Sequence, residues 1–247
     1  MPPGTPSEAI IEVRGLSRRF GRITALDQVD LVINRGEFLT VFGPNGAGKS
    51  TLIGVLSSMV KPSSGTVLFH GKSVQDDSNR LRRSIGVIEH QPLLYPHLSA
   101  RENLRFYGRM YRIDEPEARI DRVLDEVDLR TRADDVSGTF SRGMLQRLSI
   151  ARAMLHRPAI YLLDEPYSGL DQHAGDRLRD MLARLKEQGQ TILMTTHNLE
   201  RGFELSDRHI IMVKGGIAYD SPREGDDVSA LREIYYRLIS GTEGAKP

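Results

Sequence analysis

The residues best suited to chemistry lie together in the first quarter of the chain. They run Gly43, Pro44, Asn45, Gly46, Ala47, Gly48, Lys49, Ser50 and Thr51, and they fit the pattern G-x-x-x-x-G-K-[ST]. Glycines let a backbone turn tightly and bring its N–H groups against an anion. Lys49 adds a charge for the β- and γ-phosphates, and the Ser50 hydroxyl can ligate Mg²⁺. This stretch predicts a loop that holds a nucleoside triphosphate.

The segments on either side of this loop must hold it in place. Residues 37–42 are apolar and β-branched, which predicts a strand, and residues 51–56 predict the opening of a helix. A helix begins with unpaired N–H groups and a partial positive charge, which favours phosphate. An ordinary glycine-rich turn is the alternative interpretation, and the order of strand, loop and helix argues against it.

A second candidate for chemistry is the pair Asp164 and Glu165. It follows the continuous apolar run 160–163, which is typical of a strand buried on both faces of a parallel sheet. Open α/β sheets bind ligands at the carboxyl ends of such strands. Neighbouring strand residues point to opposite sides, so Asp164 could hold Mg²⁺ through water while Glu165 orients the water that attacks the γ-phosphate. A helix N-cap with a spare acid is the alternative.

Gln91 and His197 are weaker candidates. Gln91 follows a predicted strand over 84–89, where its amide could contact Mg²⁺ or the attacking water; taken in isolation, this position favours a solvated loop glutamine. His197 follows the predicted buried strand 191–194, a place suited to contacting a γ-phosphate. A structural histidine remains the alternative there.

Ser141 and Phe20 complete the candidate residues. Ser141 precedes Gly143 at the start of a predicted helix, so it could help bind an anion or could simply cap the helix. Phe20 is flanked by arginines and could stack on a purine, or it could be a core residue at the end of a strand.

The apolar pattern along the chain predicts an α/β fold with a helical insert. Strands are expected at residues 8–14, 26–33, 37–42, 65–69, 84–89, 160–163 and 191–194, with a final hairpin over 210–213 and 217–219. From Pro92 the pattern changes to three helices, of which the first starts at a capping box, Ser99 to Glu102. Strands and helices alternate again after Pro158, as in α/β proteins.

Composition limits the classes of function. The 34 Lys and Arg nearly cancel the 33 Asp and Glu, so no basic footprint indicates a nucleic-acid partner. The 247 residues include no cysteine, which excludes disulfides, thiolate metal sites and cysteine nucleophiles and fits a reducing compartment. The first residues do not resemble a secretory signal, and no apolar run approaches the roughly 20 residues that cross a bilayer. We expect a soluble, cytoplasmic protein that meets a membrane only through a partner.

Taken in order, these elements resemble the ATP-binding cassette of ABC transporters over roughly residues 9–220. The matching motifs are Walker A (Gly43 to Thr51), the Q-loop (Gln91), Walker B with its catalytic glutamate (160–165), the D-loop (168–171) and the switch histidine (His197). Phe20 falls where the family has an aromatic residue stacked on adenine. The resemblance implies ATP and Mg²⁺ as ligands. It assigns Ser50, Gln91 and Asp164 to the metal, and Glu165, His197 and Gln91 to catalysis.

One motif departs from the family pattern. Most members read L-S-G-G-Q-x-Q-R, whereas residues 140–147 of this chain read F-S-R-G-M-L-Q-R. Arg142 replaces the first glycine, and Met144 replaces the first glutamine. The resemblance implies that Ser141, Gly143 and Met144 of one copy contact the ATP that is held by another. Arg142 would then be a bulky side chain where little room is usual.

The resemblance also implies an architecture and partners. The fold would be a P-loop NTPase core with a mostly parallel sheet, an antiparallel β-subdomain and a helical insert. Residues 1–91 and 159–247 would form the core, and residues 92–158 the helical subdomain. Two cassettes would close head to tail on two ATPs, as a homodimer or a mixed pair. An integral membrane subunit would bind near the Q-loop, on the inner face of the cell membrane.

The resemblance points to a separate ATPase subunit of a multi-chain transporter. The Ser-Arg-Gly-Met variant is similar to small exporter ATPases, including those of haem export in cytochrome c maturation, and favours export. A soluble ABC-type ATPase of translation or DNA repair is the alternative. Translation members usually carry two cassettes, and repair members carry long coiled coils or zinc sites; this chain has one phosphate loop and no cysteine. A third alternative is a different P-loop enzyme, a kinase or a GTPase. No Asn-Lys-x-Asp motif is present to read guanine, and Walker B with its following glutamate favours ATP hydrolysis.

Overall fold

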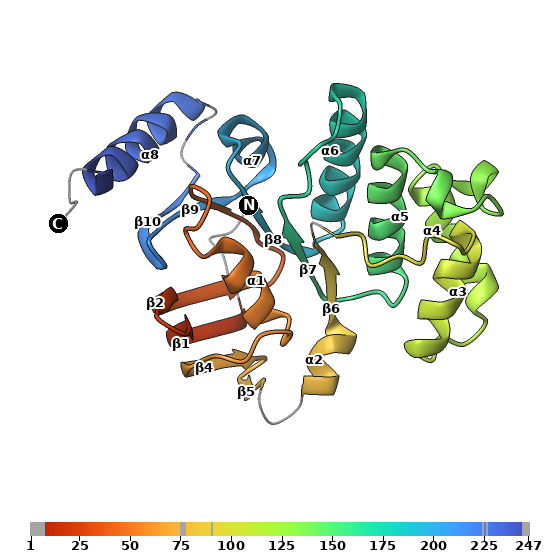
Figure 1. Ribbon diagram of the computed structural model, residues 1–247, viewed down its shortest axis with the longest axis horizontal. Coiled ribbons are helices and arrows are strands. Elements are labelled where there is room, and N and C mark those ends of the chain that lie inside the picture. Colours follow the sequence, from red (N-terminus) through yellow and green to blue (C-terminus); the bar gives the residue numbers. More distant parts are fainter. Residues whose placement is uncertain (1–7, 75–77, 90, 224, 226, 244–247) are drawn as a thin grey trace, which may run out of the picture.

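The computed structural model describes residues 8–74, 78–89, 91–223, 225 and 227–243. Two β-sheets lie at its centre, α3, α4 and α5 gather at one end, and α8 lies at the other (Figure 1). The larger sheet has the strand order β10-β9-β3-β8-β7-β6. Its strands are β3 (Phe38–Phe42), β6 (Ile85–Ile88), β7 (Ile160–Asp164), β8 (Thr191–Thr196), β9 (Arg208–Val213) and β10 (Gly216–Pro222).

Parallel pairing in the larger sheet brings the candidate residues to one edge. β3 pairs in parallel with β8 and β9, and β7 pairs in parallel with β6 and β8. β9 and β10 form the expected antiparallel hairpin. β3, β7 and β8 are buried along their whole length, which explains their continuous apolar runs. The carboxyl ends of β3, β7 and β8 therefore lie side by side, where the phosphate loop, Asp164 and His197 follow.

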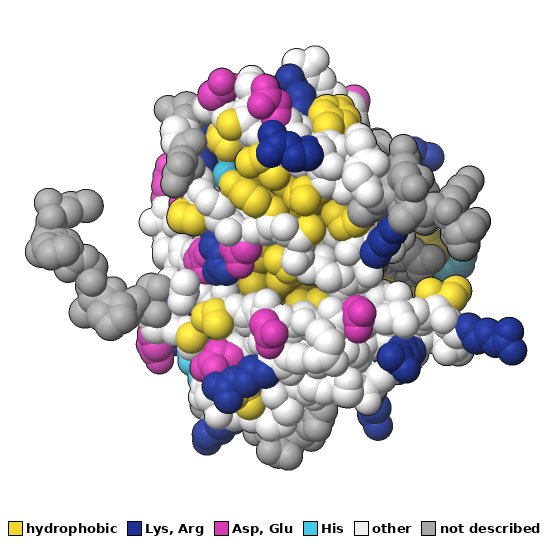
Figure 2. All heavy atoms as spheres, turned by 90° about the vertical axis from the view of Figure 1, so that its left-hand side faces the viewer, with side chains coloured by type: hydrophobic (Ala, Val, Ile, Leu, Met, Phe, Trp, Pro, Cys, Tyr) yellow, Lys and Arg dark blue, Asp and Glu magenta, His cyan; other side chains and the backbone are white. Residues whose placement is uncertain are grey.

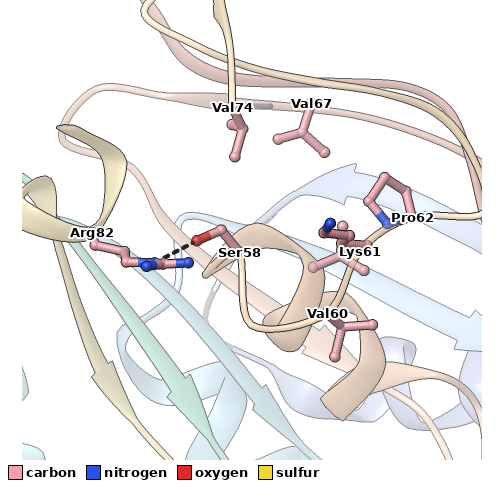
Figure 3. Close-up of a pocket in the computed structure, with 8 residues that line it drawn as sticks. Ser58, Val60, Lys61, Pro62, Val67, Val74 and Arg82 are labelled. Atoms are coloured by element: carbon pink, nitrogen blue, oxygen red, sulfur yellow. Dashed lines mark hydrogen bonds between the residues drawn. The ribbon is translucent and has the colours of Figure 1, made fainter. Parts of the chain in front are cut away.

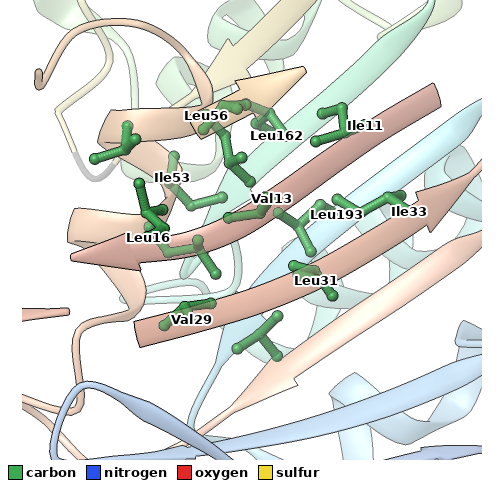
Figure 4. Close-up of a cluster of buried hydrophobic side chains, with 14 of the residues drawn as sticks. Ile11, Val13, Leu16, Val29, Leu31, Ile33, Ile53, Leu56, Leu162 and Leu193 are labelled. Carbon is green, nitrogen blue, oxygen red and sulfur yellow. The ribbon is translucent and has the colours of Figure 1, made fainter. Parts of the chain in front are cut away.

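The smaller sheet is antiparallel and has the order β2-β1-β4-β5. Its strands are β1 (Ala9–Phe20), β2 (Ile23–Asn34), β4 (Ser64–Phe69) and β5 (Lys72–Ser73). Apolar side chains of β1 and β2 pack with Ile53 and Leu56 of α1 (Lys49–Leu56) and with Leu162 and Leu193 of the larger sheet (Figure 4). This cluster fixes α1, and with it the phosphate loop, against both sheets. The expected α/β class, with a mostly parallel sheet and an antiparallel β-subdomain, is confirmed.

Between β6 and β7 the residues that the structure describes form helices and no named strand. These are α3 (Ala100–Met110), α4 (Pro116–Glu126) and α5 (Arg142–Met154), with two short 3-10 turns, η1 (Arg130–Arg132) and η2 (Ser137–Thr139). The capping box is present: the Ser99 hydroxyl accepts from the Glu102 N–H, and the Glu102 carboxylate accepts from the Ser99 N–H. The three predicted helices are therefore found, while the division into a core (1–91, 159–247) and a helical subdomain (92–158) stays a prediction.

A buried arginine ties this helical segment to the larger sheet. Arg152 of α5 is almost fully buried and donates a 2.7 Å hydrogen bond to the Val87 carbonyl of β6. Its guanidinium also lies 5.3 Å from the ring centroid of Tyr107 in α3. Because β6 ends just before Gln91, Arg152 links α5 to the strand that positions the predicted Q-loop.

The remaining helices are α2 (Ser78–Ser84), α6 (Gln172–Glu187), α7 (Leu199–Leu205) and α8 (Val228–Glu243). α6 buries Leu178, Met181, Leu182 and Leu185, as its periodicity predicts. α2 and α7 were not expected, since seven residues are too few to show a helical period. α2 also takes Ser84, so the strand predicted from that residue begins at Ile85 instead.

α8 covers an apolar cluster beside the phosphate loop. The buried members are Phe42, Leu199, Phe203, Ile211, Leu231 and Tyr235, and partly buried ones come from β9, β10 and α8. Figure 2 looks at this side of the molecule and shows hydrophobic side chains gathered in its middle, with charged side chains around them. Since Phe42 precedes the loop and α7 follows His197, the cluster supports both segments.

His209 is buried against this cluster. Its ring stacks on Phe203 with centroids 4.8 Å apart, and its Nε2 lies 2.6 Å from the Ser206 hydroxyl. Burial lowers the pKa of His209 to about 4; Arg223 lowers the pKa further, and Asp207 opposes it. The folded protein therefore holds this imidazole neutral at pH values where an unfolded chain would protonate it.

Acidification from pH 7 to pH 5 is expected to lower the free energy of unfolding by about 2 kcal/mol through His209. When the pKa of a group is lower in the folded state, its contribution to stability is complete at pH values above the unfolded-state pKa. This contribution is lost as the pH falls toward the folded-state pKa. Urea unfolding at both pH values measures the change. His209→Phe should reduce the loss, whereas His97→Gln, at an exposed histidine, should not. An equal loss in the His209→Phe variant would contradict the assignment.

Candidate functional site

The phosphate loop occupies the turn from β3 into α1. Gly48 is the N-cap of α1 and has a left-handed φ of 104°. A Cβ at this position would lie 2.4 Å from the Ala25 carbonyl oxygen, which is backbone and cannot move aside. The glycine is therefore required for both conformation and space. It turns the first N–H groups of α1 toward the loop, where an anion can bind.

Lys49 is buried with its charge inside the loop. Its Nζ donates to the carbonyls of Gly43 at 2.7 Å and Pro44 at 3.3 Å, and lies 3.3 Å from Oε1 of Glu165. The Lys49 side chain is 6% exposed. A buried ammonium is tolerated only when such acceptors surround it. The phosphates of a nucleotide would offer it stronger ones.

Glu165 joins Lys49 to His197. Its Oε2 lies 3.0 Å from Nδ1 of His197, and its Oε1 is buried without a hydrogen bond despite the nearby Lys49. Glu165 has a left-handed φ of 49°, which costs on the order of 1 kcal/mol in a non-glycine residue and is common at functional sites. Strand alternation was expected to point the side chains of Asp164 and Glu165 to opposite sides, and this explanation is wrong. β7 ends at Asp164, so a backbone turn, not the strand, sets the direction of Glu165.

Asp164 is held by a residue that the sequence analysis did not single out. Its Oδ1 accepts a 2.6 Å hydrogen bond from the hydroxyl of Thr195, which is fully buried in β8. The carbonyl of Thr195 also accepts from the N–H of Glu165 at 3.0 Å. Thr195 thus positions both carboxylates. The sequence feature that could have indicated this role is the pair Thr195 and Thr196, which follows an apolar run and directly precedes His197.

Gln91 and His197 stand at the same edge of the sheet. β6, which precedes Gln91, pairs with β7 up to Ile88 and Leu163, and the Gln91 side chain is exposed. His197 follows β8 and is largely exposed, apart from its contact with Glu165. Of the predicted catalytic residues, the structure brings Glu165 and His197 into contact and places Gln91 in the loop that follows the neighbouring strand β6.

Phe20 lies at the end of β1 and is exposed. Its exposed fraction is 45%, so the interpretation of Phe20 as a core residue is wrong. The guanidinium of Arg18 lies 4.2 Å from the centroid of its ring. A cation–π contact of this kind orients an aromatic ring at the surface. The exposed ring is available for stacking on a base.

Ser141 caps α5, and its hydroxyl accepts from the N–H of Met144 at 3.3 Å. The interpretation of Ser141 as a helix cap is therefore correct. Its side chain nevertheless remains exposed. Within the described ranges, no hydrogen bond or ion pair joins Ser141, Gly143 or Met144 to the phosphate loop of the same chain. These three residues are thus separate from the cluster formed by Lys49, Glu165 and His197.

The predicted metal ligands suit Mg²⁺ by their chemistry. Ser50, Asp164 and Gln91 all offer oxygen atoms, which this small, hard ion prefers. Ser50 is exposed at the first turn of α1, and Asp164 is fixed by Thr195. Mg²⁺ usually binds through one or two side chains together with substrate phosphates. The donor set therefore fits an ion that arrives with a nucleotide.

A cavity of about 470 Å³ lies away from these residues, at the other end of α1 (Figure 3). Its lining is Val55, Ser58, Val60, Lys61, Pro62, Val67, Val74 and Arg82. Arg82 donates to the Ser58 hydroxyl at 3.2 Å. None of the predicted site residues lines it, so this cavity is not part of the candidate site.

Comparisons with known proteins agree with this geometry. A family model described as "ABC transporter" matches residues 26–168. The uncharacterized ABC transporter ATP-binding protein YdbJ of Bacillus subtilis is 35% identical over 92% of this chain and 74% of its own length. The spermidine/putrescine import ATP-binding protein PotA of Nitratidesulfovibrio vulgaris is 38% identical over 92% of this chain, which spans 60% of that protein. The Nod factor export ATP-binding protein I of Ralstonia nicotianae is 32% identical over 98% of this chain and 81% of its own length.

Solved structures with the same fold include one described as the ATP-binding subunit of an ABC transporter. It superposes with a TM-score of 0.82 at 30% identity, over 92% of this chain and 99% of that one. A dimeric ATP-binding cassette in a post-hydrolysis state, bound to ADP and phosphate, has a TM-score of 0.78 at 30% identity, over 87% of this chain and all of that one.

Proposed function

The chain belongs to the ABC transporter family as an ATP-binding subunit with ATPase activity coupled to transport, and from this premise we propose its mechanism, partners and direction of transport. We infer that Lys49, Glu165 and His197 form the hydrolytic centre. The observation that carries this proposal is that Glu165 contacts both other residues. Lys49 Nζ lies 3.3 Å from one oxygen of Glu165, and His197 Nδ1 lies 3.0 Å from the other.

In the proposed reaction, Glu165 orients and polarises a water molecule for attack on the γ-phosphate. Lys49 stabilises negative charge on the phosphates, and His197 holds the carboxylate of Glu165 in place. Mg²⁺, when bound with the nucleotide, would neutralise phosphate charge, with Ser50, Asp164 and Gln91 as its protein ligands. The Thr195 hydroxyl of β8 keeps Asp164 oriented at the end of β7. The exposed ring of Phe20 would stack on adenine.

We propose that a second cassette completes each ATP site. Ser141 and Gly143 lie at the exposed start of α5, where helix N–H groups and the Ser141 hydroxyl can bind phosphate. They make no hydrogen bond to the phosphate loop of their own chain within the described residues, which is compatible with contact to a nucleotide held by another copy. The similarity to a dimeric cassette supports this arrangement.

We propose that a membrane subunit docks on α3 and the loop before it. Leu93, Tyr95, Phe106 and Met110 are exposed there, and the rings of Tyr95 and Phe106 are 4.9 Å apart. This apolar surface begins two residues after Gln91, so docking could respond to the nucleotide site. None of the helices in the described ranges is both long enough and apolar enough to cross a bilayer. The chain would act at the inner face of the cell membrane.

We propose export as the direction of transport. Relatives include import and export subunits, so the proposal rests on the Ser-Arg-Gly-Met sequence at 141–144. The alternative, a soluble ABC-type ATPase of translation or DNA repair, would hydrolyse ATP without binding a membrane protein. Docking on α3 therefore discriminates the two functions.

The double variant Phe106→Asp and Met110→Asp is expected to lose the membrane partner, because two charges would enter an apolar contact. The tagged chain is purified from detergent-solubilised membranes, and bound proteins with membrane spans are identified by mass spectrometry. Tyr236→Asp, an exposed site on α8, is the control. Circular dichroism checks that each variant folds. Capture of the same membrane protein by the double variant would contradict docking on α3, and its absence from every sample would favour the soluble alternative.

A further inference from the structure

Arg142 contacts the D-loop (residues 168–171) of its own chain. It is the first residue of α5, and its side chain lies over Gly169. A Cβ on Gly169 would lie 3.2 Å from Nη1 and 3.7 Å from Cδ of Arg142. Gly169 has a left-handed φ of 72°, so its bare Cα is part of the turn itself. The arginine side chain therefore covers a glycine that has no side chain of its own.

The contact of Arg142 with its own chain is van der Waals packing against Gly169. The side chain is exposed and forms no hydrogen bond or ion pair within the ranges that the structure describes. A cation at the start of a helix is electrostatically disfavoured, and the first turn of α5 contains no acidic residue to offset it. The aliphatic stem of an arginine can nevertheless cover a surface while its head stays in water.

A second close approach joins the same two elements. A Cβ on Gly143 would lie 3.0 Å from the Cβ of Ala174, in the first turn of α6. Ala174 is itself held by Asp171, which caps α6 by accepting its N–H at 2.8 Å. The start of α5 thus touches the D-loop at Gly169 and the helix after it at Ala174.

The D-loop also connects directly to the catalytic carboxylate. The N–H of Ser168 donates to the Glu165 carbonyl at 3.0 Å. Arg142, Gly169 and Glu165 line one cavity of about 310 Å³, which Glu89 and Ser168 also border. A movement of Arg142 would therefore be felt in the turn that sets the position of Glu165.

We propose that Arg142 is a positioning residue that couples the start of α5 to the D-loop within one chain. The inference rests on the proposed two-cassette function. Ser141 and Gly143 would reach the nucleotide of the second copy. Arg142 makes the D-loop move together with these two residues, and the D-loop in turn moves Glu165. A glycine at position 142 would leave the two segments free to move separately.

Hydrogen exchange of the nucleotide-free chain tests the coupling without requiring ATP hydrolysis. Arg142→Gly should speed exchange of the amides in residues 168–171 by about tenfold, because the local contact that restrains them is lost. Arg142→Met keeps most of the stem and should stay within about twofold of the unvaried chain. Arg177→Met, at an exposed arginine of α6, is the control and should not change it. Unchanged exchange in Arg142→Gly would overturn the proposal.

Kinetics of ATP hydrolysis provide the second readout. Arg142→Gly should lower kcat about tenfold with little change in the KM for ATP, because nucleotide binding to the phosphate loop does not involve Arg142. Arg142→Lys, with a similar stem, should restore most of kcat. A rise in KM with unchanged exchange would show instead that Arg142 contacts nucleotide directly. If the unvaried chain neither hydrolyses ATP nor dimerises, the proposed function fails, while the exchange experiment still decides the coupling.

Gly169→Ala supplies a double-variant test of the same contact. Its left-handed backbone is strained by any side chain, with or without Arg142. The added Cβ meets the guanidinium only when Arg142 is present. The effect of Gly169→Ala on exchange should therefore be smaller in the Arg142→Gly background. Identical effects in both backgrounds would contradict contact between the two residues.

Discussion

Glu165→Gln is expected to lower kcat for ATP hydrolysis by at least about a hundredfold while ATP still binds. The amide keeps the shape of the carboxylate and can still contact His197, so the local structure should persist. It carries no negative charge and is a far weaker base, so it cannot activate the attacking water. The expected consequence is a complex that forms with ATP and does not turn over.

The surroundings of Glu165 explain why a small change should have so large an effect. Its Oε1 is buried without a hydrogen bond, and Lys49 is 3.3 Å away. The ion pair with Lys49 is therefore the main protein contact that offsets burial of this oxygen. The left-handed backbone at Glu165 adds a conformational cost. Both features are consistent with the proposed catalytic role of Glu165.

Phosphate release and light scattering in the presence of ATP and Mg²⁺ measure the two parts of this prediction. Glu165→Gln should show almost no turnover and should accumulate as a dimer, since hydrolysis no longer separates the copies. Glu233→Gln, an exposed glutamate of α8, should behave as the unvaried chain. Normal turnover in Glu165→Gln would remove Glu165 from the catalytic role. A strictly monomeric variant with ATP bound would contradict the two-cassette arrangement.

The residues of the candidate site that the sequence indicated are those that stand next to one another in the chain. Gly48, Lys49 and Ser50 form one motif because a single turn and one helix start create the predicted phosphate-binding loop. Asp164 and Glu165 were found in the same way, at the end of one apolar run. The position of His197 followed from the rule that parallel strands end at a common edge. Its contact with Glu165 agrees with that expectation.

The contacts that the sequence did not predict depend on register and on turns. Thr195 reaches Asp164 only because β7 and β8 pair with these two residues opposite each other. No local pattern specifies that register. The left-handed turn at Glu165 was also hidden, because strand alternation assumes that β7 continues through it. Short α7, capped by Asn198, lies below the length at which helical periodicity can be recognised.

Arg142 illustrates how a distant residue changes the meaning of a substitution. From sequence alone, a bulky residue in place of a glycine was expected to crowd the contact with the second copy. In the structure, Gly169 leaves space for the side chain within the same chain. Because Gly169 has no side chain, the side chain of Arg142 can lie over it. The two residues are far apart in the sequence, and only the fold brings them together.

Lys49→Ala is expected to raise the dissociation constant for ATP by at least about thirtyfold, because one partner of a buried charge pair is removed. In the structure, Lys49 is held by the Gly43 and Pro44 carbonyls and by Glu165. Bound phosphates would replace these weaker partners. In the variant, phosphate would meet the loop N–H groups alone, and Glu165 would lose its nearest cation. Both changes oppose binding of an anion beside a carboxylate.

Isothermal titration with ATP and thermal unfolding with and without ATP measure this loss. A ligand that binds only the folded state raises its stability by mass action, by about 2.7 kcal/mol at a hundred times the dissociation constant. The unvaried chain should therefore melt at a higher temperature with ATP, and Lys49→Ala should show almost no shift. Lys61→Ala is the matched control, because Lys61 is an exposed lysine that lines the cavity at the other end of α1. An equal ATP-induced shift in Lys49→Ala would show that the phosphates bind elsewhere, and the assignment of the hydrolytic centre to the carboxyl ends of β3, β7 and β8 would fail with it.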